Sequence, residues 1–129
     1  MASYSTQDAE GCSASGSIAV LNSGDAFYQC VTTSLTPNAA YKTGFLYKNA
    51  AGSGTAYCGY IFYDGFNCSG NELTNFALGA SSDGTTWAAG TNTGTLPAGT
   101  TSISILCDAF LGTGYYDEIY FNQSSTSTF

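Results

Sequence analysis

Three tyrosines in two aromatic-rich segments are the residues whose type and spacing best suit ligand binding. Tyr28 lies in FYQCVTT, and Tyr57 and Tyr63 lie in TAYCGYIFY. If both segments are strands, alternation places these rings on the side opposite to the residues that we expect in the core. A flat exposed ring stacks on the apolar C–H face of a neutral pyranose, while nearby amides and hydroxyls bind the sugar hydroxyls. We therefore predict carbohydrate binding by Tyr28, Tyr57 and Tyr63, with packing beneath a loop as the alternative role.

The sequence offers little for catalysis. It contains no histidine, which excludes Ser-His-Asp and Cys-His arrangements and histidine-bound zinc. Glycoside hydrolysis needs two carboxyl groups that flank the scissile bond. The candidate carboxylates are Asp64, Asp108, Asp117 and Glu118. Asp117 and Glu118 are neighbours in a strand-like segment, so they point to opposite faces and cannot form the pair together. We predict that the protein is not an enzyme.

The charge balance excludes several classes of partner. The 129 residues include two basic residues against nine acidic ones, which gives a net charge of −7 and a pI near 4.1. Nucleic acids and anionic membrane surfaces are bound by clustered lysine and arginine, so we expect neither as a partner. No apolar run reaches the length of a membrane span. The length indicates one domain.

Five cysteines in so short a chain indicate an oxidising compartment, and we predict a secreted, extracellular protein. Cys58 and Cys107 alternate in phase with apolar residues, so both should point inward. Either an inter-sheet disulfide or two buried thiols would satisfy that orientation. Cys12 lies in a polar lead-in. At least one cysteine has no partner within the chain, because the number is odd.

Apolar alternation between Gly, Pro and Asp turns predicts an all-β protein built from seven short strands. The expected strands are 17–22, 26–33, 41–48, 56–63, 85–93, 101–110 and 115–122. The segment that carries Leu73, Phe76 and Leu78 has an interrupted pattern and is interpreted mainly as a loop. Such spacing is typical of a two-sheet antiparallel β-sandwich. The predicted organisation is an irregular lead-in over 1–16, the sandwich over 17–122 and a low-complexity tail over 123–129.

Four motifs occur in an order that resembles a known family. FYQCV, FYDGFNCSG, LPAGTTSISI and YYDEIYFN are similar to segments of jelly-roll carbohydrate-binding modules found in secreted bacterial polysaccharide-degrading enzymes and surface proteins. The resemblance covers roughly residues 16–122. It implies a jelly-roll fold, non-catalytic binding of a polysaccharide or oligosaccharide, and a disulfide between Cys30 and Cys68.

The same resemblance implies a structural calcium ion. The last strand of these modules carries an aspartate that often helps to hold the ion, and Asp117 matches it. Calcium takes six to eight oxygen ligands. Asp8 or Glu10 would supply another carboxylate.

The sequence departs from the family at its start, since 1–16 does not match the usual first strand. Either the sequence begins after that strand or the sandwich lacks it. A missing strand would leave an open sheet edge. This suggests an alternative function, a secreted structural or adhesive subunit that self-assembles by strand addition from Ala2–Gln7 or Ser124–Phe129. We expect instead that one terminus folds back and that the protein is a monomer.

Overall fold

The computed structural model describes residues 2–5, 7, 9, 16–20, 22, 24–108 and 114–123. These residues form nine strands and no helix. The strands are β1 (Ala2–Ser5), β2 (Ser17–Val20), β3 (Ala26–Val31), β4 (Ala40–Asn49), β5 (Gly54–Tyr63), β6 (Glu72–Ser82), β7 (Ala88–Thr95), β8 (Ser102–Asp108) and β9 (Gly114–Asn122). In this part of the chain there is accordingly no helix long and apolar enough to cross a membrane.

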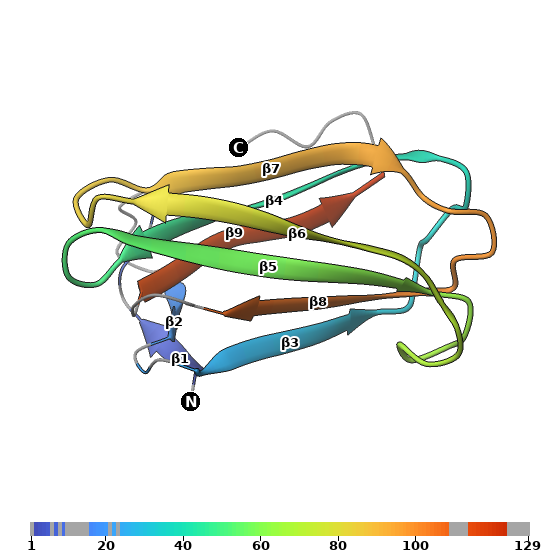
Figure 1. Cartoon of the computed structure of the whole chain (residues 1–129), viewed down its shortest axis with the longest axis horizontal. Helices are drawn as coiled ribbons and strands as arrows, with labels where there is room; N and C mark the ends of the chain where they lie inside the picture. Colours follow the sequence, from blue (N-terminus) through green and yellow to red (C-terminus); the bar gives the residue numbers. More distant parts are fainter. Residues whose placement is uncertain are drawn as a thin grey trace.

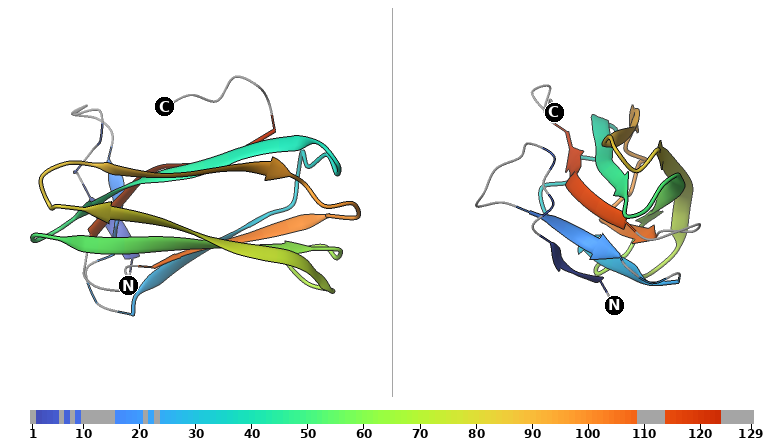
Figure 2. Two further views of the ribbon diagram at one scale, coloured as in Figure 1. Left: turned by 45° about the horizontal axis from the view of Figure 1, so that its top comes forward. Right: turned by 90° about the vertical axis from the view of Figure 1, so that its left-hand side faces the viewer.

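The strands form two antiparallel sheets that pack face to face (Figure 1). A five-stranded sheet has the order β1-β2-β9-β4-β7, and a four-stranded sheet has the order β3-β8-β5-β6. The end-on view in Figure 2 shows the two layers. The predicted two-sheet antiparallel sandwich is confirmed.

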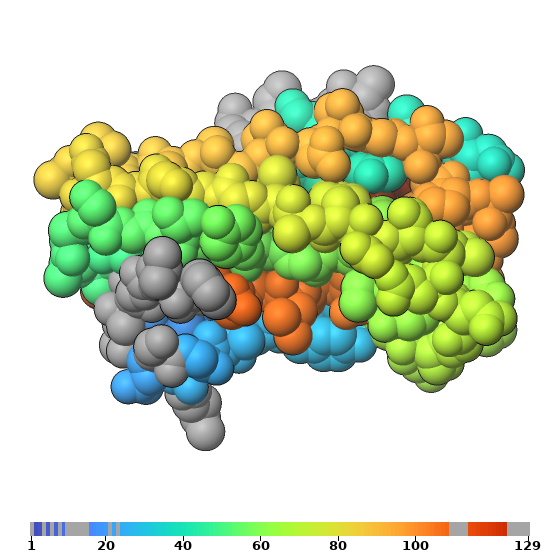
Figure 3. Space-filling model, in the orientation of Figure 1, coloured from blue at the N-terminus to red at the C-terminus, as the bar shows by residue number. Residues whose placement is uncertain are grey.

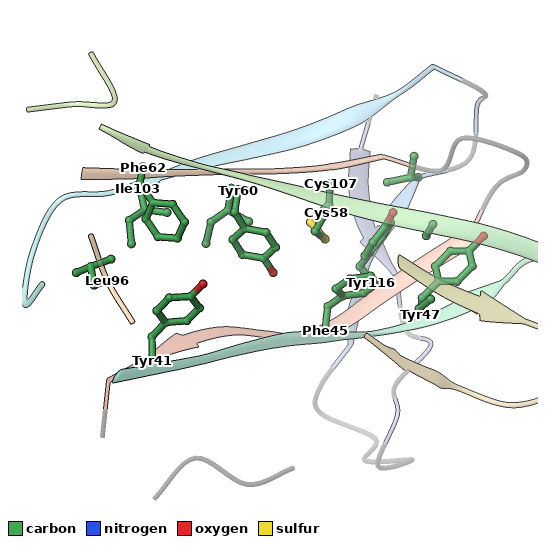
Figure 4. Close-up of a cluster of buried hydrophobic side chains, with 14 residues drawn as sticks. Tyr41, Phe45, Tyr47, Cys58, Tyr60, Phe62, Leu96, Ile103, Cys107 and Tyr116 are labelled. Atoms are coloured by element: carbon green, nitrogen blue, oxygen red, sulfur yellow. A yellow bond between two sulfur atoms is a disulfide. The ribbon is translucent and has the colours of Figure 1, made fainter. Parts of the chain in front are cut away.

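Alternate side chains of both sheets fill the space between the layers (Figure 4). Phe45 and Tyr47 of β4 pack against Tyr116 of β9, with ring centroids 5.5 and 5.3 Å apart, and all three side chains are fully buried. Each large apolar side chain that leaves water in this way contributes about 1.5–3 kcal/mol. The Tyr116 hydroxyl donates a hydrogen bond to the carbonyl of Asp108, which ties the two sheets together. Burial raises the pKa of Tyr116 well above its ordinary value.

Two strands were not expected from the sequence. The interpretation of the segment after Cys68 as mainly a loop is wrong, because Glu72–Ser82 forms β6 and pairs with β5 along most of its length. Its first half is largely exposed, so hydrophobic alternation is weak there and the backbone ladder defines the strand. The interpretation of 1–16 as irregular is wrong for Ala2–Ser5, which forms β1 against β2.

One strand is shifted from its expected position. The structure places β7 at Ala88–Thr95 rather than 85–93. The carboxylate of Asp83 accepts hydrogen bonds from the backbone N–H groups of Thr85 and Thr86, at 2.8 and 2.9 Å. These residues are therefore held in a turn before the strand begins.

One disulfide ties the four-stranded sheet to the loop after β5, and a second lies within that sheet. Cys30 and Cys68 are bonded, which confirms the pairing that the resemblance implied. Cys58 and Cys107 are also bonded and fully buried, so both point inward as expected. They occupy directly opposite positions on β5 and β8. Both arrangements left open are therefore wrong, since the bond joins two strands of one sheet. Cys12 lies outside the described residues.

Candidate functional site

The outer face of the four-stranded sheet carries the tyrosines predicted to bind sugar. Tyr28 on β3 lies opposite Leu106 on β8, and Tyr57 on β5 lies opposite Asp108 on β8. Tyr28 and Tyr57 are thus two strand spacings apart, about 10 Å across the sheet, and are offset by two residues along it, with Leu106 on the strand between them. We call this surface, with Tyr28, Tyr57, Tyr63, Leu106 and Asp108, the tyrosine face.

The rings of the tyrosine face are accessible. Tyr28, Tyr57 and Leu106 are 55%, 42% and 43% exposed. The Tyr57 ring lies over Gly79 on β6, where a Cβ added to the glycine would lie 3.0 Å from Cε1 of the tyrosine. The glycine therefore lets the ring lie close to the sheet. This arrangement supports the ring from below and leaves part of its surface for a ligand.

Tyr63 lies apart from the other two tyrosines. It is six residues beyond Tyr57 on β5, about 20 Å along the strand. It is half-buried and lies opposite Ser102, at the end of the sheet. The structure therefore brings Tyr28 and Tyr57 together around Leu106 but places Tyr63 at the border of the face. Leu106 was missed, although its outward phase in TSISILCDAF would have indicated it.

The loop between β5 and β6, residues 64–71, closes this end of the tyrosine face. Cys68 of the loop is bonded to Cys30, which shares the outer side of β3 with Tyr28. The hydroxyl of Ser102 accepts a hydrogen bond from the N–H of Cys68 at 2.9 Å and donates one to the carbonyl of Gly65. Ser102 is fully buried as a result. In the space-filling view this part of the chain, in lime green, stands out at the lower right (Figure 3).

The charges near the tyrosine face are negative. Asp108 lies beside Tyr57, while Asp64 and Glu72 lie at the loop end near Tyr63. Hydrogen bonds from the side-chain amide and the backbone N–H of Asn71 hold the pKa of Asp64 below its ordinary value. Both lysines of the chain lie on β4, in the other sheet. Fixed carboxylates without a nearby cation favour a neutral ligand over an anionic one.

The outer face of the five-stranded sheet is a second ring-bearing surface, and the sequence reasoning missed it. Lys42, Leu46 and Lys48 alternate on β4 with buried residues, so they point outward. Tyr115 lies opposite Lys48, and Tyr120 lies opposite Gly44 with its ring over the glycine. Alternation with the core residue Tyr116 could have indicated the outward direction of Tyr115, but the register shift in β9 hides that of Tyr120. Both are half-buried, and are therefore less accessible than Tyr28.

Asp117 was expected to hold calcium. Its two carboxylate oxygens accept hydrogen bonds from the backbone N–H groups of Ala9 and Glu118, at 2.9 and 2.8 Å. The described residues contain no group of three or more His, Cys, Asp or Glu side chains that could hold a metal ion. Asp8 and Glu10 lie outside those residues.

A groove opens between the two sheets where β2 and β9 of one sheet face β3 of the other. Its volume is about 540 Å³. Ile18, Phe27 and Ile119 supply apolar surface, and Gln29 and Glu118 supply polar groups. The sandwich is thus less tightly closed at this edge.

Comparison with known proteins connects this geometry to a fold. No family model matches the sequence, and no curated protein matches it at a significant level. Solved structures do match. The C-terminal family 22 carbohydrate-binding module of xylanase 10B from Clostridium thermocellum superimposes with a TM-score of 0.72 at 18% identity, covering 98% of this chain and 83% of that one. This chain has the fold of a carbohydrate-binding module.

Other solved structures with this fold include single modules and parts of larger proteins. The CBM22-1 xylan-binding domain of Xyn10C from Paenibacillus barcinonensis has a TM-score of 0.72 at 10% identity, with 98% of this chain and 83% of that one covered. The enzymatically active domain of tailspike protein 4 from bacteriophage CBA120 has a TM-score of 0.69 at 18% identity, with 96% of this chain covered. The chain spans only 18% of that tailspike domain, and only 25% of a xylanase 10B structure that joins a family 22 module to a GH10 module. At these identities the similarity shows the fold alone.

Proposed function

We propose that the protein is a non-catalytic module that binds a neutral polysaccharide through the tyrosine face. The observation that carries this proposal is the pair of exposed rings, Tyr28 and Tyr57, on the two strands that flank Leu106 on one outer sheet face. Rings of this kind stack on the apolar faces of sugar units. Several of the solved structures with this fold are carbohydrate-binding modules, which supports the proposal.

The charge of the surface narrows the ligand class. Asp108, Asp64 and Glu72 would repel the carboxylates of an acidic polysaccharide, and no lysine lies on this sheet to offset them. A neutral glycan meets no such repulsion. We also propose that the protein works outside the cell, because two disulfides suit an oxidising compartment.

Affinity electrophoresis against neutral and acidic polysaccharides tests this function directly. The expected result is retardation by at least one neutral polysaccharide, with calorimetry giving the affinity for the ligand found. Acidic polysaccharides should bind more weakly. Uniform absence of binding to plant, algal and microbial glycans would contradict the proposal. Exclusive binding of acidic glycans would instead favour the lysine-bearing face of the other sheet.

A further inference from the structure

Phe66 lies in the loop 64–71 and is 74% exposed, more than any other large apolar side chain among the described residues. A ring in this position contributes little to the core. Single exposed apolar residues are common on protein surfaces, and exposure alone would carry no inference. The conformation of the loop that holds Phe66 is the feature that distinguishes it.

The loop is tightly wound. A Cβ added to Gly65 would lie 2.5 Å from the carbonyl oxygen of Ser69, and one added to Gly70 would lie 2.5 Å from Oδ1 of Asp64. Asn67 and Cys68 both adopt positive φ angles, 56° and 55°. Two consecutive residues other than glycine in this region are unfavourable and persist only where the surrounding structure holds them.

Several interactions hold the loop in this shape. The disulfide anchors Cys68 to β3. The carboxylate of Asp64 accepts hydrogen bonds from the backbone N–H and the side-chain amide of Asn71, at 2.7 and 2.9 Å. The hydroxyl of Ser69 donates to the carbonyl of Phe66 itself. The backbone that carries the exposed ring is therefore preorganised, which lowers the entropic cost of binding a ligand there.

The loop also borders the tyrosine face. Cys30, its anchor, is two residues from Tyr28 on the same side of β3. Beside Phe66, the exposed residues Asn67 and Ser69 carry an amide and a hydroxyl. An aromatic ring with uncharged hydrogen-bonding groups around it suits a neutral sugar unit.

We propose that Phe66 forms a second sugar-stacking position, so that one extended neutral polysaccharide contacts both the tyrosine face and the loop. This inference rests on the proposed function. The β5 strand alone separates Tyr57 from the loop by about 20 Å. A disaccharide stacked on Tyr57 is too short to reach Phe66 as well, so only a longer chain contacts both rings.

The test compares a polymer with its own disaccharide, using the neutral glycan that the wild-type protein binds. Calorimetry on Phe66→Ala should show an affinity for the polymer about tenfold lower and an unchanged affinity for the disaccharide. Phe66→Tyr keeps a flat ring and should bind like the wild type. Phe66→Leu keeps apolar area without a flat ring and should behave like Phe66→Ala. All three variants should keep the wild-type melting temperature, since the side chain is exposed.

The outcomes separate this inference from the proposed function. If Tyr57→Ala weakens polymer binding and Phe66→Ala does not, the inference is overturned and the tyrosine face stands. If Phe66→Ala weakens disaccharide and polymer equally, the loop is part of a single short site, which also overturns it. If neither substitution changes binding, or the wild-type protein binds no neutral glycan, both proposals fail.

Discussion

At the scale of single residues, the proposed function depends most on Tyr57 and Tyr28. Replacing either by alanine removes a stacking surface and should weaken polysaccharide binding by about 1–3 kcal/mol. Isothermal titration calorimetry measures this loss. The melting temperature should change little, because both rings are partly exposed.

Tyr115→Ala is the matched control, since it removes a tyrosine from the outer face of the other sheet. It should leave the affinity unchanged. If Tyr115→Ala lowers the affinity and Tyr57→Ala does not, the binding site lies on the five-stranded sheet instead. A fall in stability without a fall in affinity would assign Tyr57 to packing against Gly79.

Asp83 is the residue for which the structure gives the clearest pH dependence. Hydrogen bonds from the backbone N–H groups of Thr85 and Thr86, and from their hydroxyls, hold its pKa well below the ordinary value of 3.8. A lowered pKa in the folded state means that ionised Asp83 stabilises the fold above about pH 4, and that this contribution is lost as the pH falls through the folded-state pKa.

Asp83→Asn should therefore melt at a lower temperature than the wild type at pH 7. The difference should shrink as the pH is lowered below 4, because the wild-type carboxyl group then approaches the neutral form that asparagine imitates. Thermal unfolding of both proteins across this pH range checks the prediction. A constant difference at every pH would show that the charge of Asp83 does not contribute.

At the scale of elements, the disulfide between Cys30 and Cys68 joins β3 to the loop after β5 across 38 residues. A cross-link of this span restricts the unfolded chain and contributes about 3–4 kcal/mol. The variant with both cysteines replaced by alanine should lose about that much free energy of unfolding in urea titrations. It should also bind the polymer more weakly, since Phe66 is no longer held in place. Unchanged unfolding would show that β3 is positioned by its pairing with β8 alone.

The sequence predicted β4 and β5 because one side of each strand faces the core and the other side faces away from it. In β4 and β5, buried tyrosines and phenylalanines alternate with outward residues, and this period is visible in the sequence. In β6, the first residues are exposed on both sides, and small or polar residues such as Thr74 and Ala77 carry no period. Its position depends on hydrogen bonds to β5, which are long-range and leave no local signal.

The candidate site, too, was predictable only in part. Alternation gave the outward direction of Tyr28 and Tyr57, which the register of β3, β8 and β5 then brings together. The contribution of Phe66 could not be foreseen, since its exposure follows from a loop shape that the disulfide and Ser102 impose. The bond between Cys58 and Cys107 likewise depends on the pairing of β5 with β8, which the sequence leaves open.

At the scale of the whole molecule, calcium remains a prediction from the family resemblance. If Asp117 and either Asp8 or Glu10 hold a structural ion, the ion binds only the folded state and raises the melting temperature by mass action. Thermal unfolding in excess calcium and in chelator measures the effect. Asp117→Asn is the control and should abolish any difference. Equal melting temperatures in calcium and chelator would rule out a structural ion of this kind.

Assembly is the last property of the whole molecule that the structure bears on. β1 pairs with β2 over four residues within the chain, so the edge of β2 that a missing first strand would expose is already occupied. β3 remains an outer strand of its sheet, beside the groove lined by Phe27 and Ile18.

We predict a monomer at micromolar concentration with and without reductant, measured by light scattering. A dimer that reductant dissociates would indicate an intermolecular disulfide and point to Cys12. A dimer that resists reductant would indicate strand addition at β3, because an edge strand with unpaired N–H and C=O groups beside an apolar groove accepts an additional strand. That second outcome would replace the monomeric binding module with the self-assembling adhesive subunit.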